Sequence, residues 1–337
     1  MRLKYCIAAL LIFITNLIVA QTNAELADSV KSGFRGLSVV NENVLWMSGR
    51  KGLVGNSYNG GKKWKWNRVQ GFEKNDFRSI HAFDKRNAVI ATAGFPAAIL
   101  FTTNAGKSWT TSYISKDSAM FFDGISFWNN QHGIIFGDPV NGRMYLSETF
   151  DGGKTWNEMP FADRPQLQNG EASFAASGTT IRTLPDGHVY IATGGAVSRL
   201  WHSRDFGHHW EVMNTPILQG KPSQGIFSIA FRDTLNGIIV GGDYTNDTLR
   251  KDNCFLTSDG GKTWKAPEIP PFGYRSCVEY DGNLVIATGT SGTDRSNDSG
   301  ESWVMAVGSV GANSVRIVPV KNIFTCVFCG GKYGLPK

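Results

Sequence analysis

One short motif occurs six times along the chain, and this repetition limits the possible folds more than any other feature. Each copy consists of a Ser or Thr, any residue, Asp or Asn, any residue, Gly, two further residues and Trp. The first copy spans 57–64, the last spans 296–303, and successive motif tryptophans are 39 to 54 residues apart. A period of this length is typical of stacked structural units. The 337 residues are therefore expected to form one repetitive domain.

The motif has a structural explanation that requires no ligand. The Asp or Asn side chain can accept hydrogen bonds from amides of its own turn, Gly supplies a positive φ, and Trp packs inward. A metal or anion site is not expected, because each copy has at most one carboxylate at the acceptor position. The acceptor and Trp of the successive copies are Asn59 and Trp64, Asn104 and Trp109, Asp151 and Trp156, Asp205 and Trp210, Asp259 and Trp264, and Asp298 and Trp303.

Short β-rich runs separated by Asn, Asp and Gly turns lie between the motifs, as at 36–40, 44–48 and 51–55. Four such strands in each repeat are typical of a propeller blade. After Trp303 the chain supplies further strand-like runs, as at 314–320, without another motif. We predict an all-β propeller of seven four-stranded blades, the last incomplete. Six blades with a terminal extension are the alternative.

The first 24 residues have the pattern of a secretory signal peptide. Basic residues precede an apolar stretch over 5–20, and small residues follow at Ala20 and Ala24. A membrane anchor is the alternative, but the stretch is shorter than the roughly 20 residues that a spanning helix needs. We predict cleavage near residue 20, or as late as 24, and export to the periplasm or beyond without a stable membrane span. Residues 21–33 would form an N-terminal segment that could close the ring, and 34–337 the propeller.

Charge and cysteines exclude several kinds of function. The formal charge of +6 includes two basic residues of the signal, so nucleic-acid binding is not supported. No glycine-rich phosphate loop precedes a helix, so no nucleotide cofactor is expected. Four cysteines follow the signal, namely Cys254, Cys277, Cys326 and Cys329. Their disulfide pairing is open, and the CxxC spacing of the last two favours buried thiols over a metal site because no second pair accompanies it.

The six motifs resemble Asp-box motifs, also called bacterial neuraminidase repeats, and Gly-Gly-Lys-Thr-Trp at 152–156 and 260–264 is close to that consensus. Together with strand starts such as Phe34-Arg35-Gly36-Leu37 and 77–80, the pattern resembles the photosystem II assembly and stability factor family and its non-photosynthetic bacterial relatives. The likeness covers 34–334. It implies a propeller, but it leaves function open because similar propellers include both glycosidases and non-catalytic assembly factors.

Arginines recur near the first strand of several repeats, and the first strand of a propeller blade lines the central channel. These residues are Arg35, Arg78, Arg182, Arg275 and Arg316. We expect them to form an anion-attracting ring at one channel mouth, which the basic patch of the resembled family also implies. Local ion pairs are the alternative. Glu171, within the longest departure from the repeat at 169–179, could meet one of them there or belong to an ordinary loop.

A sialidase-type glycosidase is the competing function. Such an enzyme would use three Arg, a Tyr activated by Glu, and an Asp acid/base. Phe34-Arg35 stands where its Phe-Arg-Ile-Pro would lie but lacks Ile-Pro, and the adjacent Glu279 and Tyr280 point to opposite faces of a strand. Glu171 could replace the Glu from another repeat. We therefore expect an exported, monomeric, non-catalytic binding or assembly module without cofactor or metal, whose partner is an acidic protein segment or an anionic glycan.

Overall fold

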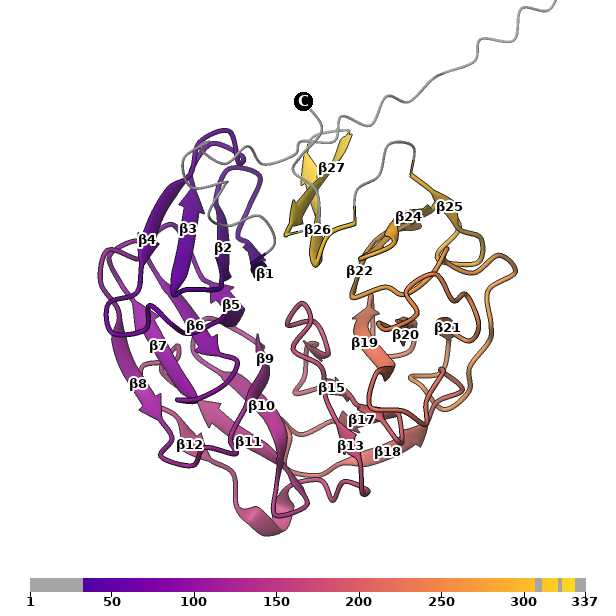
Figure 1. Cartoon of the computed structure of the whole chain (residues 1–337), viewed down its shortest axis with the longest axis horizontal. Helices are drawn as coiled ribbons and strands as arrows, with labels where there is room; N and C mark the ends of the chain where they lie inside the picture. Colours follow the sequence, from indigo (N-terminus) through magenta and orange to yellow (C-terminus); the bar gives the residue numbers. More distant parts are fainter. Residues whose placement is uncertain (1–32, 307–310, 321–322, 331–337) are drawn as a thin grey trace, which may run out of the picture.

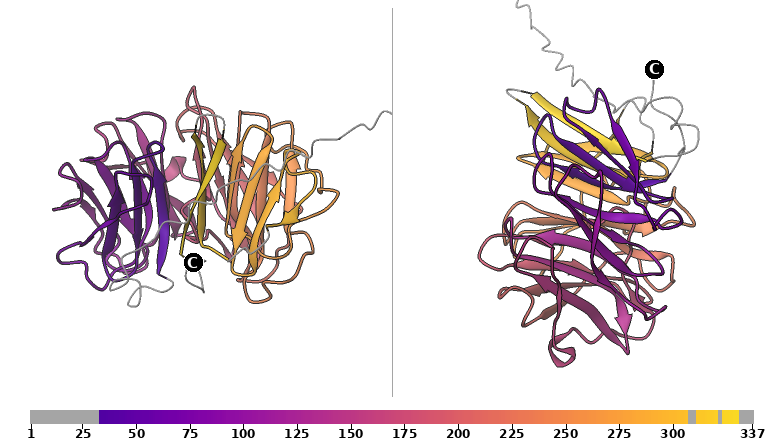
Figure 2. Two further views of the ribbon diagram at one scale, coloured as in Figure 1. Left: turned by 90° about the horizontal axis from the view of Figure 1, so that it is seen from above. Right: turned by 90° about the vertical axis from the view of Figure 1, so that its left-hand side faces the viewer.

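The computed structural model describes residues 33–306, 311–320 and 323–330. Antiparallel sheets stand side by side in a ring (Figure 1). Seen from its edge, the ring is a thick disc whose strands run from one face to the other (Figure 2). The all-β propeller predicted from the repeats is confirmed. The predicted signal over 1–20, the segment up to residue 32 and the strand expected at 332–334 lie outside the described residues.

The strands follow the motif repeat, and in the first three blades each strand lies beside its chain neighbour. The first blade consists of β1 (Phe34–Val39), β2 (Leu45–Gly49), β3 (Leu53–Ser57) and β4 (Lys65–Arg68). The second consists of β5 (Phe77–Ala82), β6 (Ala88–Thr92), β7 (Ala98–Thr102) and β8 (Thr110–Ile114). The third consists of β9 (Phe122–Phe127), β10 (Gly133–Val140), β11 (Arg143–Thr149) and β12 (Asn157–Glu158), and a short 3-10 helix, Phe161–Asp163, follows it.

The second half of the ring is less regular. The fourth blade consists of β14 (Ile181–Thr183), β15 (Val189–Ala192), β17 (Arg199–Ser203) and β18 (Glu211–Asn214). The fifth consists of β19 (Gln224–Phe231), β20 (Gly237–Asp243) and β21 (Cys254–Thr257), extended on the β19 side by the short strands β16 (Gly194–Gly195) and β13 (Glu171–Ala172). The sixth consists of β22 (Cys277–Asp281), β23 (Leu284–Gly289), β24 (Gly292–Ser296) and β25 (Val304–Met305).

The prediction of seven four-stranded blades is wrong, and the alternative of six blades with a terminal extension fits better. After the sixth blade the described residues add a sheet of two strands only, β26 (Ser314–Val320) and β27 (Ile323–Cys329). This hairpin lies between β22 and β1 (Figure 1). Side chains of Asn313 and Ser314 donate hydrogen bonds to the backbone oxygens of Phe34 and Arg35. The extension thereby closes the ring against the first blade.

In five repeats the motif forms the turn that precedes the outermost strand, and in the fifth only an isolated bridge between Lys265 and Leu256 follows it. In the third blade, Asp151 accepts hydrogen bonds from the amides of Lys154 and Thr155 at 2.9 and 3.0 Å. The Thr149 hydroxyl binds the amide of Gly153, whose φ is +85°. The Trp156 indole donates to the Gly153 oxygen at 3.1 Å. The bonds are those expected from the residue types, and the indoles of Trp64, Trp210 and Trp303 repeat the last one.

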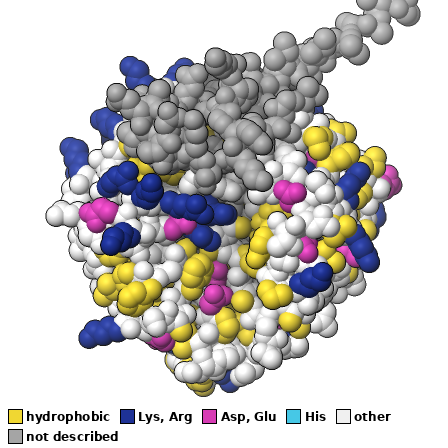
Figure 3. All heavy atoms as spheres, in the orientation of Figure 1, with side chains coloured by type: hydrophobic (Ala, Val, Ile, Leu, Met, Phe, Trp, Pro, Cys, Tyr) yellow, Lys and Arg dark blue, Asp and Glu magenta, His cyan; other side chains and the backbone are white. Residues whose placement is uncertain are grey.

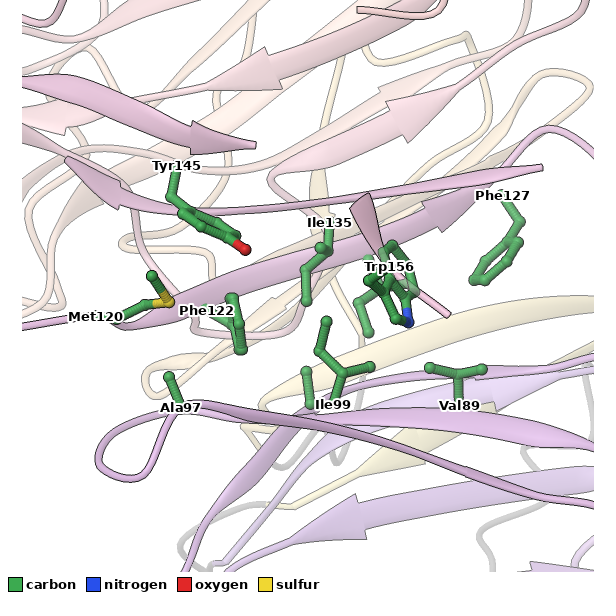
Figure 4. Close-up of a cluster of buried hydrophobic side chains, with 11 residues drawn as sticks. Val89, Ala97, Ile99, Met120, Phe122, Phe127, Ile135, Tyr145 and Trp156 are labelled. Carbon is green, nitrogen blue, oxygen red and sulfur yellow. The ribbon is translucent and has the colours of Figure 1, made fainter. Parts of the chain in front are cut away.

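The motif also joins neighbouring blades. A Cβ on Gly153 would lie 2.5 Å from the Cγ2 of Val89, a residue of β6 in the preceding blade. Trp156 and Val89 belong to one buried cluster together with Ile99, Phe122 and Ile135 (Figure 4). The cluster places side chains of β6 and β7 against those of β9 and β10, so the hydrophobic core lies between blades rather than within one. Burial of this apolar surface is the main stabilising contribution to the ring.

Candidate functional site

The first strands of the blades line the channel, and four of them carry a bulge. The pairing of β1 with β2 passes from Phe34 to Gly36 and skips Arg35, and the pairing of β5 with β6 skips Arg78 in the same way. Asp123 in β9 and Phe227 in β19 are skipped at the matching places. A bulge redirects the side chain of the extra residue. The first and second blades therefore present Arg35 and Arg78 in equivalent positions, where their inner strands begin.

Both guanidinium groups hold an internal segment. Arg35 Nη1 donates to the Ala176 oxygen at 3.0 Å, and Arg78 Nη1 reaches the Ala175 oxygen at 3.5 Å. Arg78 also pairs with Asp76 at 2.9 Å. Burial and the nearby Arg78 charge lower the pKa of Arg35. The two arginines lie together, but part of their hydrogen-bonding capacity is used within the chain.

The internal segment, residues 173–180 and hereafter the channel segment, crosses the middle of the ring. Besides the two arginine contacts, the Ser177 hydroxyl donates to the Ser276 oxygen at 2.7 Å, and Thr179 bonds the Ser228 hydroxyl. Ser177 and Thr179 are both buried. The channel segment thus contacts inner strands from both halves of the ring and divides the channel into two ends.

The end where β1 and β5 begin is strongly basic. Around Arg35 and Arg78 lie four solvent-exposed cations on the adjoining turns and strand ends, namely Arg50, Lys51, Arg68 and Lys74. These six residues are called the basic face below. Figure 3 shows Lys and Arg side chains gathered over this sector and reaching towards the middle of the ring. The acidic residues Glu73 and Asp76 interrupt it, and Asp76 is the ion-pair partner of Arg50 at 3.8 Å as well as of Arg78. The positive charges therefore outnumber the negative ones here.

The opposite end of the channel holds a cavity of about 810 Å³. Arg182 and Arg316 line it, together with Glu279. Arg182 Nη2 lies 3.3 and 3.4 Å from the two Glu279 carboxylate oxygens, and Arg316 Nη1 lies 3.7 Å from one of them. The five predicted arginines therefore do not form one ring, because Arg182 and Arg316 line this cavity whereas Arg35 and Arg78 lie at the other end of the channel, where β1 and β5 begin.

Arg275 is a structural residue, which corrects its placement at the channel mouth. It and Asp294 are both fully buried, and Arg275 Nε donates to the Asp294 carboxylate at 2.7 Å. Further bonds go to the oxygens of Tyr274 and Ser291. The guanidinium closes a local network and has no contact with solvent.

Glu171 is likewise internal rather than a group of the channel mouth. It pairs with Arg199, and the Thr193 hydroxyl and the Gln168 amide donate to its oxygens at 2.6 and 2.9 Å. Arg199 itself had no signal in the sequence, because it lies in the third strand of its blade and outside the recurring Arg pattern. Glu171 does pair with an arginine, but the partner is Arg199 and not one of the five predicted arginines, and the pair is buried.

Glu279 and Tyr280 do not form a catalytic pair. Glu279 faces the cavity, whereas the Tyr280 hydroxyl donates to the Ser299 oxygen at 3.0 Å on the other side of β22. The arrangement follows from the alternation of side chains along a strand. Because Glu171 is saturated by its own partners, it cannot activate Tyr280 either. The sialidase chemistry considered from the sequence has no nucleophile and base in contact at these residues.

Asp123 is a further residue that the sequence did not single out. It occupies the bulge of β9, matching Arg35 and Arg78 in the other blades, and is fully buried. Burial and the neighbouring Asp138 carboxylate raise its pKa well above the usual range, against the opposing effect of Arg78. Only the alignment of the bulges reveals its equivalence to the two arginines.

The described residues contain neither a metal-binding group of side chains nor a membrane-spanning helix. Across 33–306, 311–320 and 323–330, no three His, Cys, Asp or Glu side chains are grouped so as to hold a metal ion. Within the same ranges, no helix has the length and apolar character to cross a membrane.

The cysteines that the structure describes are free thiols. Cys254, Cys277 and Cys329 are buried, and Cys326 is half-buried. Burial raises the pKa of Cys254, Cys326 and Cys329, that of Cys326 to about 11. These three thiols are therefore neutral at ordinary pH, and the predicted preference for buried thiols agrees with the burial of the cysteines.

Comparisons with known proteins give one relative in sequence and many in structure. No family model matches the chain. The chain is 25% identical over 225 residues to the photosystem II assembly lipoprotein Ycf48 of Synechococcus sp. (strain CC9902). That match covers 66% of this chain and 59% of the relative, so the chain spans well under two thirds of that protein.

Two solved structures of Ycf48 are similar over most of the chain. The structure described as YCF48 bound to D1 peptide has a TM-score of 0.60 at 16% identity, covering 85% of this chain and 87% of its own. The structure of YCF48 from Cyanidioschyzon merolae has a TM-score of 0.56 at 15% identity, covering 86% and 90%. At this level of identity the structural likeness shows the propeller fold. The chain is thus a β-propeller with sequence similarity to a photosystem II assembly protein.

Proposed function

We propose that this protein is an exported, non-catalytic propeller that binds an acidic segment of a partner protein at the basic face. The observation that carries the proposal is the concentration of four exposed cations around the two bulged arginines, against the carboxylates of Glu73 and Asp76. The sequence similarity to an assembly protein supports a binding rather than a catalytic role, and the similar structure that contains a bound peptide supports a peptide ligand. Export follows from the signal pattern at residues 1–24.

Accessible and internal arginines have different parts in this proposal. Arg50 has a side-chain exposure of 57%, and Arg68 is exposed with one guanidinium nitrogen on the Lys51 oxygen. These two residues attract and hold carboxylates by charge, an interaction that salt weakens. Arg35 and Arg78 lie deeper and fix the position of the bound segment, since each retains donors beyond its bond to the channel segment.

The test compares two charge reversals on the first blade. Arg50→Glu with Arg68→Glu removes the exposed part of the basic face. Lys62→Glu with Lys63→Glu changes the net charge equally, but its residues are exposed on the motif turn at the opposite end of the blade. Binding of a fluorescent Glu-rich peptide is measured by anisotropy at low and high salt, with a Gln-rich peptide as the neutral probe.

We expect the first variant to lose most of its affinity for the Glu-rich peptide and most of its salt dependence. The second variant should bind nearly as well as the unaltered protein. Equal weakening in both variants would show that net charge alone attracts the peptide. No preference for the Glu-rich peptide over the Gln-rich one would exclude an acidic segment as the ligand.

A further inference from the structure

The cavity at the motif end of the channel is separate from the basic face. Ser177, Gly178 and Thr179 of the channel segment line it on the inside, and the turn at 41–43 lines its rim. Its volume of about 810 Å³ falls within the range of small-molecule sites, roughly 300 to 1,000 Å³. A ligand bound here would not contact Arg50 or Arg68, which lie at the other end of the ring.

The charged groups of the cavity are not balanced. Arg182 and Arg316 share the single carboxylate of Glu279, and the exposed fractions of these three side chains are 28%, 20% and 15%. His81 also lines the cavity, but burial lowers its pKa to about 4 and leaves it neutral. Glu42 lies on the exposed rim, where water screens its charge. The inner part of the cavity therefore carries one excess positive charge.

Arg182 has an unused donor. Its Nε is buried and has no hydrogen-bond partner among the described residues, whereas its Nη2 binds Glu279. A buried donor without a partner is unfavourable by about 1 to 3 kcal/mol. A guanidinium that offers Nε and a terminal nitrogen along one edge binds a carboxylate with two parallel hydrogen bonds. The cavity thus contains the excess charge to accept a second carboxylate, which the Arg182 Nε can meet only by turning out of its buried position.

We propose that this cavity binds a small hydroxylated carboxylate, a sugar acid, whose carboxylate is held by Arg182 and Arg316. The walls support a hydroxylated ligand rather than an apolar one. The Ser38 hydroxyl and the side-chain amides of Asn41 and Asn43 are among the lining groups, whereas the Ser126 and Thr183 hydroxyls bond each other. The Ser38 hydroxyl and the two amides can exchange hydrogen bonds with sugar hydroxyls, and the aliphatic and aromatic side chains between them can contact the ring.

The Glu279 carboxylate is expected to weaken ligand binding. Glu279 competes with the ligand for both arginines, so its neutralisation should tighten binding. D-glucuronate is the probe, with D-glucose as the matched neutral compound, and binding is measured by titration calorimetry. We expect glucuronate to bind and glucose to bind far more weakly. Arg182→Gln and Arg316→Gln should each weaken glucuronate binding by about tenfold, equivalent to 1.4 kcal/mol, whereas Glu279→Gln should strengthen it several-fold.

Two further variants keep the result interpretable. Arg50→Gln removes a cation from the basic face and should leave glucuronate affinity unchanged. Arg182→Lys retains the charge but lacks the two-donor edge, so it should also weaken binding. It provides the test if Arg182→Gln does not fold. The proposal is overturned if neither the unaltered protein nor Glu279→Gln binds glucuronate, if glucose binds equally well, or if Arg50→Gln has the same effect as Arg182→Gln. Failure of peptide binding at the basic face would not bear on any of these results.

Discussion

Gly153 and Val89 belong to neighbouring blades and approach so closely that a Cβ on the glycine would lie 2.5 Å from a methyl group of the valine. The same glycine has a φ of +85°. Two separate constraints therefore require glycine at this position. The glycines at the matching motif positions 207, 261 and 300 also face side chains of the preceding blade at 2.7 to 3.0 Å. The motif sets the spacing between blades as well as the turn within one.

Replacement of Gly153 by Ala should destabilise the protein by both constraints. The left-handed conformation alone costs about 1 to 2 kcal/mol for a residue with a side chain, and the clash with Val89 adds about 1 to 3 kcal/mol. Gly71→Ala is the control, because Gly71 has a φ of +83° with nothing near its Cβ position. Urea unfolding should show a clearly larger loss for Gly153→Ala. Equal losses would mean that the contact between blades adjusts at no energetic cost.

Arg275→Ala should be strongly destabilising. It leaves the carboxylate of Asp294 buried without its counter-charge, which typically costs 3 to about 5 kcal/mol. Removal of both charges in Arg275→Met with Asp294→Leu should recover much of the loss. Arg50→Ala, at an exposed pair with a separation of 3.8 Å, should change the free energy of unfolding by less than about 1 kcal/mol. If Arg275→Ala unfolds at the same urea concentration as Arg50→Ala, the buried pair does not stabilise the fold.

Stability should fall in acid as the motif carboxylates become protonated. Hydrogen bonds from the Thr263 side chain and amide lower the pKa of Asp259 to about 2. The pKa of Asp205 is also lowered to about 2, because hydrogen bonds from His209 outweigh the effect of burial. A carboxyl group whose pKa is lower in the folded state stabilises it above the unfolded pKa, and the effect disappears as pH falls from about 4 to 2.

Asparagine at position 259 should reduce this pH dependence. Asn retains the acceptor oxygen, as Asn59 does in the first motif, where it binds the Lys63 amide at 2.9 Å. The melting temperature of Asp259→Asn should therefore differ less between pH 7 and pH 3 than that of the unaltered protein. The same drop in both proteins would place the acid sensitivity elsewhere.

Thiol labelling should distinguish the four cysteines. Cys326 is the most accessible of them and should react first, slowly because its pKa is about 11. Cys254, Cys277 and Cys329 should react only after unfolding. Quantification in guanidinium without reductant should give four thiols from the mature protein. Two thiols or none would show that disulfides form, contrary to the free cysteines of the structure.

The residue types of the motif were enough to predict its local structure, because its bonds run between residues at most four positions apart. The alternation of side chains along a strand was likewise enough to predict that Glu279 and Tyr280 point to opposite faces. The placement of the arginines required more. Alternation indicates that a residue of an inner strand faces the channel, but it does not indicate how far along the channel axis the residue lies. Arg35 and Arg182 follow similar apolar residues, yet they belong to opposite ends.

Ion pairs between residues distant in sequence could not be predicted either. Arg199 and Glu171 are 28 residues apart, and Arg275 and Asp294 are 19 apart. Nothing in the spacing distinguishes a buried pair from two surface charges. The number of blades was misjudged for a related reason: strand-like runs after Trp303 have the right composition, but composition does not indicate whether four strands pair into one sheet. The described part of that region contains one hairpin.

The junction between β1 and the hairpin β26–β27 also determines when the ring can be completed. The contacts that join Phe34 and Arg35 to Asn313 and Ser314 connect residues 279 positions apart. During synthesis the first blade is made well before the hairpin that becomes its neighbour on that side, because 279 positions separate the contacting residues. Until then the apolar edge formed by Phe34, Leu37 and Leu45 is without Val318 and Val327, which cover it in the finished molecule. The ring thus stays open at this junction until the β26–β27 hairpin has been made, long after the first blade.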